Sequence, residues 1–585
     1  MTSTVSSHCT KETYAHSFLS NFGHNRIVGA MNSRLTTVIV TGLVLLAACG
    51  STSSNVTARG AAPIAGDATA PTTDSTGPTT TPTADTTADT TADATADTTA
   101  DSTAATTDTA TTDTSTVDTG APVTAAPQTT DTLASQPPVF DFGTGKAPQK
   151  YDAVLQVEVN DIQAFWTNEF PRVFGSPYTP LTGKIFAGFP GRNDIPGCGS
   201  KQNSDYEKDL KDNAFYCSQG DFVAYDDADL FPKLSSKLGD LSLGVVLAHE
   251  WGHSIQARAG VPDNTPTIKL EQQADCYAGS WSAHLARGEN PKLTFSDAEI
   301  KDAMLALLSV RDPAGSDPAD PSAHGSGFDR VGAFQDGFVN GAKQCSTYID
   351  KFPGVLELPA DASFNQTNGN APLDDPDKPV LPPTDPKDTT VAGIYGLLIS
   401  PTESNSLPTF WIDQLKGGNI TFTPPKLAGY NDQGPFPKCS VTDKFAGKPY
   451  VFCPDDNTLY FNRTIGTKFY HAFGDYAIGY LLSNGYGDAV QTALGSTFKN
   501  AKRSLLNDCL TGAYTAGSLP NSASTNPNRV SIQAGDLDEA VETAVSIGDA
   551  KSTDNIIGTG FQKIAAFRSG VLGGLDACNK QIAAG

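Results

Sequence analysis

The pattern of apolar and polar residues is clearest in the segment LSLGVVLAHEWGHSIQARAG, residues 241–260. Leu243, Val246 and Leu247 recur at the three- and four-residue spacing of a helix, and Gly260 is a suitable stop. This pattern predicts a helix of about four turns. The segment LEQQADCYAGSW, residues 270–281, predicts a second helix shortly after it.

Two other segments alternate with the two-residue period of a strand. They read NAFYCSQGDFVAYDD, residues 213–227, and KPYVFCPDDNTLYFN, residues 448–462. Each contains an apolar strand, a polar turn and a second strand, and each therefore predicts a β-hairpin. The hairpins and helices together predict an α+β fold that is mainly helical.

Two halves of the chain are similar to each other. GFDRVGAFQDGFVNGAKQC at 327–345 resembles GFQKIAAFRSGVLGGLDAC at 560–578, and Cys276 and Cys345 are as far apart along the chain as Cys509 and Cys578. We therefore predict a duplication, with one domain at 139–355 and a related domain at 393–585. A Pro-rich linker at 356–392 separates them, because its proline density disfavours both helix and sheet.

The N-terminal region carries a targeting signal. Residues 31–50 contain one arginine, a short apolar run and small residues before Cys49. This pattern predicts a lipoprotein signal peptide over 31–48, with a lipid on Cys49 after cleavage; plain secretion is the alternative. Residues 1–30 precede the signal with polar, unpatterned sequence, so we expect translation to start at Met31 and treat 1–30 as a non-native extension. Residues 49–138 are rich in Thr, Ala and Asp and predict a disordered linker.

Charge and cysteines narrow the class of protein. The net charge is -24, and no cluster of lysine and arginine offers a path for a phosphate backbone, so nucleic acid is excluded as a partner. The chain has 10 cysteines, of which eight follow Cys49, and export would place these in an oxidising compartment. The repetition between the halves suggests four disulfides: Cys198–Cys217, Cys276–Cys345, Cys439–Cys453 and Cys509–Cys578.

The candidate chemistry lies in the first half. His249 and His253 are four residues apart on the predicted helix, so both imidazoles project from one face and can hold one Zn²⁺, with Glu250 beside them to act on a metal-bound water. Glu271 can supply a third ligand, and Asp275 can accept the outer N–H of a ligating histidine. The alternative is a pair of surface histidines and two solvated acids on ordinary helices.

Three segments in this order carry a resemblance to a known family: HEWGHSIQ, EQQADCYAGSW and HGSGFDRVGAFQDGF. The chain resembles the exported or membrane-anchored neutral zinc metallopeptidases of bacteria over about residues 185–350. The resemblance implies a gluzincin-like, zincin-type domain in which His249, His253 and Glu271 bind the metal and Glu250 is the general base.

A residue that stabilises the oxyanion is less well defined by the sequence. His324 is the candidate, because a hydrogen-bonding side chain can stabilise the charge that develops during amide hydrolysis. A histidine in a Gly-rich loop is more often structural, and Arg330 on the next helix is the alternative.

The second half provides an internal comparison. An ungapped alignment of Gly260 with Gly485 places Gly474 over His249, Asp475 over Glu250 and Ile478 over His253. Counting back from the cysteines places Ser504 over Glu271, Ile557 over His324 and Asp508 over Asp275, so only Asp275 is matched by the same residue type. We therefore predict that the second domain has lost its catalytic residues and kept the fold for a binding or packing role.

The sequence thus predicts an extracytoplasmic zinc metallopeptidase that acts on peptide or protein substrates. Its lipid would anchor it to the outer face of the bacterial cytoplasmic membrane. Two alternatives stay open: a non-catalytic cell-surface binding or assembly protein, and a zinc amidase acting on cell-wall peptides.

Overall fold

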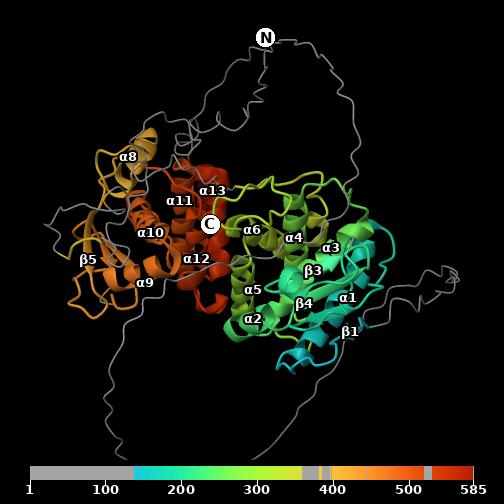
Figure 1. Ribbon diagram of the computed structural model, residues 1–585. Helices are drawn as coiled ribbons and strands as arrows, with labels where there is room; N and C mark the ends of the chain where they lie inside the picture. Colours follow the sequence, from blue (N-terminus) through green and yellow to red (C-terminus); the bar gives the residue numbers. More distant parts are fainter. Residues whose placement is uncertain are drawn as a thin grey trace, which may run out of the picture. The chain divides into compact units, whose positions relative to one another are not determined.

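The computed structural model describes residues 137–199, 201–356, 358, 381–384, 396, 398–442, 444–519 and 530–583. The predicted signal peptide, Cys49 and most of both linkers lie outside these residues. The described part is mainly helical with two small sheets, which confirms the predicted α+β class (Figure 1). Among its helices, none combines the length and the apolar character needed to cross a membrane.

The first half is built on a four-stranded sheet in the order β1-β2-β4-β3. Its strands are β1 (Phe140–Asp141), β2 (Ile185–Gly188), β3 (Ala214–Cys217) and β4 (Phe222–Asp226). β3 and β4 are antiparallel and form the predicted hairpin, whereas β2 pairs with β1 and β4 in parallel. β3 therefore lies at an edge of the sheet, and the disulfide Cys198–Cys217 ties the preceding loop to it.

The helices of the first half surround one central helix, α3. They are α1 (Asp152–Phe174), the short π-helix η1 (Tyr206–Leu210), α2 (Leu230–Leu238), α3 (Leu241–Ala259), α4 (Thr267–Ala286), α5 (Asp297–Ser309) and α6 (Gly327–Cys345). α3 contacts α1, α2, α4, α5 and β3, so most of its side chains are buried. It ends at Gly260, which adopts φ 71° in the left-handed region as predicted for a helix stop.

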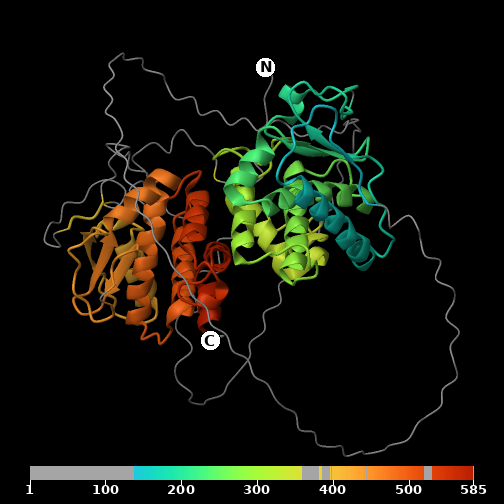
Figure 2. The same cartoon turned by 90° about the horizontal axis from the view of Figure 1, so that it is seen from below.

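From α1 onward, the second half repeats the main order of the first: a helix, a strand, a hairpin and then further helices. β5 (Lys426–Tyr430), β6 (Tyr450–Cys453) and β7 (Thr458–Asn462) form a sheet in which β5 is parallel and β6 antiparallel to β7. The helices are α8 (Leu407–Gly417), α9 (Arg463–Phe473), α10 (Tyr476–Ala493), α11 (Asn500–Gly517), α12 (Asp536–Ile547), the 3-10 turn η2 (Ser552–Asp554) and α13 (Gly560–Ala583). α10 packs on this sheet (orange in Figures 1 and 2).

All four predicted disulfides are present. The two long-range bridges join α4 to α6 and α11 to α13, the most extensively packed helix pairs in each half. The repeated topology and the repeated bridges agree with a duplication, and common descent of the halves stays a prediction.

The expected register between α3 and α10 is wrong. In α3 the amide of Gln256 donates to the carbonyl of Leu270 on α4, and in α10 the amide of Gln491 donates to the carbonyl of Arg503 on α11. Gly485 is no helix stop, because α10 continues to Ala493 and a Cβ at Gly485 would meet the side chain of Leu459. The packing match places Asn484, Gly485 and Asp488 at the positions of His249, Glu250 and His253.

Close approach of α4 and α6 depends on two glycines. A Cβ at Gly337 on α6 would overlap the carbonyl oxygen of Cys276 on α4, and one at Gly279 on α4 would overlap the carbonyl oxygen of Phe334 on α6. Gly512 and Gly570 have the same relation between α11 and α13. The backbones of α6 and α4 therefore lie in direct contact at these glycines.

We predict that Gly337→Ala lowers the free energy of unfolding by about 1–3 kcal/mol, because α6 must move away from α4 to admit the methyl group. Gly417→Ala is the matched control, since a Cβ at Gly417 meets no atom within 4 Å, and we expect a change within about 0.5 kcal/mol. Urea denaturation of both variants measures the difference. Equal stability of the two variants would contradict the close packing.

Candidate active site

Three side chains converge between α3 and α4. His249 and His253 lie on α3 and Glu271 on α4, and their donor atoms lie within 4.8 Å of one another. The Nε2 of His249 is 3.1 Å from Glu271 Oε2, and the Nε2 of His253 is 3.5 Å from Glu271 Oε1. The three residues that the sequence singled out as metal ligands are thus brought together.

The outer nitrogens of both histidines have partners of their own. His249 Nδ1 is 2.7 Å from Asp275 Oδ1, and His253 Nδ1 is 2.9 Å from Gln256 Oε1. Acceptors on Nδ1 fix the tautomer in which Nε2 is free to bind a metal. The structure therefore brings Asp275 to its expected place and adds Gln256, which the sequence analysis missed although its three-residue spacing from His253 on one helix was a usable signal.

Arg330 on α6 holds Asp275 from the other side. Its Nε and Nη2 donate to the two oxygens of Asp275 at 2.9 Å each, and its Nη1 donates to the carbonyl of Val310. Asp275 is completely buried. Burial would raise the pKa of this carboxyl, but the guanidinium and the imidazole of His249 lower it below its usual range. A buried charge of this kind is stable only when it is paired.

The metal-free donors form a tightly coupled group of charges. Burial alone would lower the pKa of His249, but the carboxylates of Asp275 and Glu271 raise it to about 10. Burial opposes the charge of His253 too, and Glu271 raises its pKa. The pKa of Glu271 falls well below its usual range, because the two histidines outweigh its burial. Two imidazoles and one carboxylate are the three-ligand set of hydrolytic zinc sites, and this donor set fits zinc.

Glu250 lies beside the donors with its own support. It is 7 % exposed, and its Oε2 accepts a hydrogen bond of 2.9 Å from the backbone N–H of Tyr216 on the edge strand β3. Burial raises the pKa of Glu250, and the neighbouring histidines oppose that shift. A raised pKa suits a group that accepts and returns a proton near neutral pH.

These residues line a cleft of about 840 Å³. Part of the lining is apolar, with residues from α2, α3, α5 and the loop after α5: Leu230, Val246, Leu307 and Val310. The edge strand β3 borders it, and the segment 320–324 lines it as well. A volume of this size admits several residues of a peptide.

His324 lies in this cleft on the loop between α5 and α6. One carboxylate, Asp312, accepts hydrogen bonds from the backbone N–H of His324 and of Gly325 at 2.7 Å each and lies 3.2 Å from His324 Nδ1. His324 is therefore oriented by its neighbours. Arg330, the alternative, already donates to Asp275 and Val310 and serves to hold Asp275.

The equivalent region of the second half lacks these donors. Asp508 takes the place of Asp275, and it accepts hydrogen bonds from Lys563 Nζ and Tyr480 Oη. Ser504, at the position of Glu271, also contacts Lys563, and Asp488 pairs with Arg503. Neither the expected register nor the corrected one therefore places the three zinc ligands in the second half.

Fold and donor set together define a class, the zincin-type metal-binding domain, in which one helix supplies two histidines and a neighbouring helix a carboxylate. Residues 117–348 match the family described as putative neutral zinc metallopeptidase.

The relatives are themselves uncharacterised. Proteins of Mycobacterium tuberculosis and Mycobacterium bovis are each 28% identical over 251 residues, which cover 38% of this chain and 80% of the relative. YpfJ of Escherichia coli is 27% identical over 176 residues, 26% of this chain and 57% of its own length. No solved structure matches the chain.

We predict that zinc binding releases about one proton per ion between about pH 7 and pH 9, because the raised pKa of about 10 keeps His249 protonated in the metal-free protein. Affinity should rise with pH over this range. In the metal-free protein the raised pKa of His249 stabilises the fold fully below about pH 6.5, and this contribution is lost as pH rises through about 10. Calorimetry in two buffers of different ionisation enthalpy counts the protons, and a pH-independent affinity would contradict the prediction.

We predict that Asp275→Asn weakens zinc binding about 10- to 100-fold, because the amide no longer fixes the His249 tautomer and leaves Arg330 without its carboxylate. Asp263→Asn, at an exposed position lining the same cleft, is the control and should bind zinc like the wild type. Competition against a chelating indicator measures both affinities. Equal affinities in the two variants would show that Asp275 does not support the ligand.

Proposed function

We propose that residues 139–355 are a zinc metallopeptidase domain that hydrolyses peptide bonds, with the zinc held by His249, His253 and Glu271. One observation carries the proposal: both histidines have their outer nitrogens bonded and their Nε2 atoms facing one carboxylate, next to a buried glutamate in an open cleft. The family match supports the same reaction class.

A zinc ion bound there would polarise the substrate carbonyl and lower the pKa of a water toward neutrality. Glu250 accepts the proton of the attacking water and returns it to the leaving amine, which its buried position and raised pKa favour. His324, oriented by Asp312, donates a hydrogen bond to the carbonyl oxygen as negative charge develops on it. Arg330 and Asp275 keep His249 in its binding tautomer.

The cleft favours an extended peptide. The carbonyl of Asn213 accepts a hydrogen bond from the N–H of Asp226, so Asn213 faces β4. Because backbone groups alternate in direction along a strand, those of Ala214 and Tyr216 face the outer edge of β3, where the N–H of Tyr216 already donates to Glu250. A substrate strand can add to this edge by main-chain hydrogen bonds. The apolar part of the lining, from α2, α3 and α5, then accepts an apolar side chain of the substrate.

We further propose that the mature protein is exported and held at the outer face of the bacterial cytoplasmic membrane by lipid on Cys49. The four disulfides support export, since such bridges persist in oxidising compartments. Incorporation of labelled palmitate into the wild type, but not into Cys49→Ser, would test the anchor.

The test of the reaction is Glu250→Gln in the zinc-loaded protein. We predict that the rate of hydrolysis of unmodified peptides that contain an apolar side chain falls about a hundredfold to ten-thousandfold, because the proton acceptor is lost. The zinc content should stay the same. Glu207→Gln, at an exposed position of η1, is the control and should keep full activity.

Cleavage of peptides and of cell-wall stem peptides should be measured side by side with the same three proteins. Hydrolysis that survives Glu250→Gln would remove Glu250 from the mechanism. One zinc per chain without hydrolysis of either substrate class by the wild type would replace the peptidase proposal with a binding or assembly role.

A further inference from the structure

The loop between α5 and α6, residues 310–326, carries His324 to the cleft. Inside the first half it is held by Asp312, which binds the backbone of His324 and Gly325, and by Arg330, which binds the carbonyl of Val310. Both ends of this loop also meet the second half of the chain.

Helix α12 of the second half contacts both ends of the loop. Arg311, next to Asp312, lies with its Nε 3.0 Å from Asp538 Oδ2 and its Nη1 3.0 Å from Glu542 Oε1. The other oxygen of Asp538 accepts a 2.8 Å hydrogen bond from the backbone N–H of Phe328, in the first turn of α6. One carboxylate of α12 therefore binds the start of the loop and the helix that follows it.

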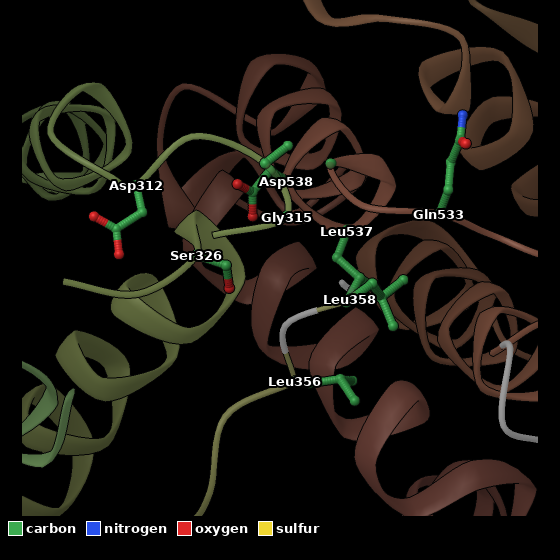
Figure 3. A pocket seen from close by; sticks show the side chains of 10 residues that line it. Asp312, Gly315, Ser326, Leu356, Leu358, Gln533, Leu537 and Asp538 are labelled. Carbon is green, nitrogen blue, oxygen red and sulfur yellow. The ribbon is translucent and has the colours of Figure 1, made fainter. Parts of the chain in front are cut away.

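The surroundings of this contact are shielded from water. Asp538 is 4 % exposed, and Arg311 and Glu542 are partly buried. A small pocket beside this contact is lined by Gly315 and Ser326 of the loop and by Leu537 and Asp538 of α12 (Figure 3). Ion pairs that are partly removed from water are screened less than surface pairs, so this contact constrains the loop more than an exposed pair would.

Helix α13 of the second half holds α6 itself. Arg568 donates to the carbonyl of Phe328 and lies 4.0 Å from the centre of its ring, in the space that Gly332 leaves free. The amide of Gln335 donates to the carbonyl of Phe561 at 2.8 Å. α6 carries Arg330, so these contacts reach the metal ligands through Arg330, Asp275 and His249.

We propose that the second half is a brace for the active site of the first, with Asp538 and Glu542 as positioning residues that hold the His324 loop and the start of α6 in place. This inference rests on the proposed function. It gives the second half a task that needs its fold and the acids of α12 but not the zinc ligands of the first half.

The test uses the full chain with two variants. Asp538→Ala removes the pair with Arg311 and the bond from Phe328, and Arg311→Gln removes the pairs with Asp538 and Glu542 but keeps the bond from Phe328. Hydrogen–deuterium exchange of residues 310–330 should rise in both variants. With peptide substrate kcat/KM should fall about tenfold, mainly in kcat, since a positioning loop that shifts misplaces a group of the transition state. Zinc content and the Tm of the whole protein separate this local effect from general unfolding.

Two controls sharpen the result. Asp576→Ala, which removes an exposed acid from α13, should leave exchange and kinetics unchanged. Asp538→Glu restores the charge and should recover part of the loss. Combining Arg311→Gln with Asp538→Ala should have a smaller effect than the sum of the two single variants, because both remove the Arg311–Asp538 pair.

Exchange and kinetics equal to wild type in both Asp538→Ala and Arg311→Gln would overturn the brace, as would a lowered Tm with unchanged kcat and unchanged loop exchange. If the wild type itself hydrolyses nothing, the peptidase proposal fails separately, and the exchange of residues 310–330 still decides whether α12 holds the loop.

Discussion

The carboxylate of Asp275 is the interaction on which the rest of the site depends. It is completely buried, lies on α4, and joins the imidazole of His249 on α3 to the guanidinium of Arg330 on α6. An unpaired charge in this position would be strongly destabilising, so the three helices must meet with these groups in contact. The glycines at the crossing of α4 and α6 make that approach possible.

The second half keeps this arrangement and changes its chemistry. Asp508 on α11 is again a buried acid between three helices. It accepts hydrogen bonds from Lys563 on α13, which takes the place of Arg330, and from the hydroxyl of Tyr480 on α10. The buried ion pair therefore serves the fold in both halves, and only the first half adds metal donors to it. A structural interaction of this kind explains how the two halves can share this packing while only the first has the zinc ligands.

Much of the site could be predicted because it is local in sequence. The helical spacing of His249 and His253, and the acids at 271 and 275, follow from the periodicity of two helices. The repeated cysteines similarly predicted all four disulfides. Contacts between distant elements could not be read in this way: the N–H of Tyr216 on Glu250, the parallel strands β1 and β2, and the pairing of Arg311 with α12 depend on tertiary packing. The register of α10 was missed because Gly485, a packing position inside the helix, was aligned with Gly260, which ends α3.

The central claim is that one zinc ion binds between α3 and α4 of the first half. A crystal structure of the zinc-loaded chain, with anomalous diffraction measured on both sides of the zinc absorption edge, tests it most directly. The account predicts one zinc peak bound by Nε2 of His249, Nε2 of His253 and the carboxylate of Glu271, with no fourth protein ligand. A peak elsewhere, or a fourth protein side chain on the metal, would contradict it.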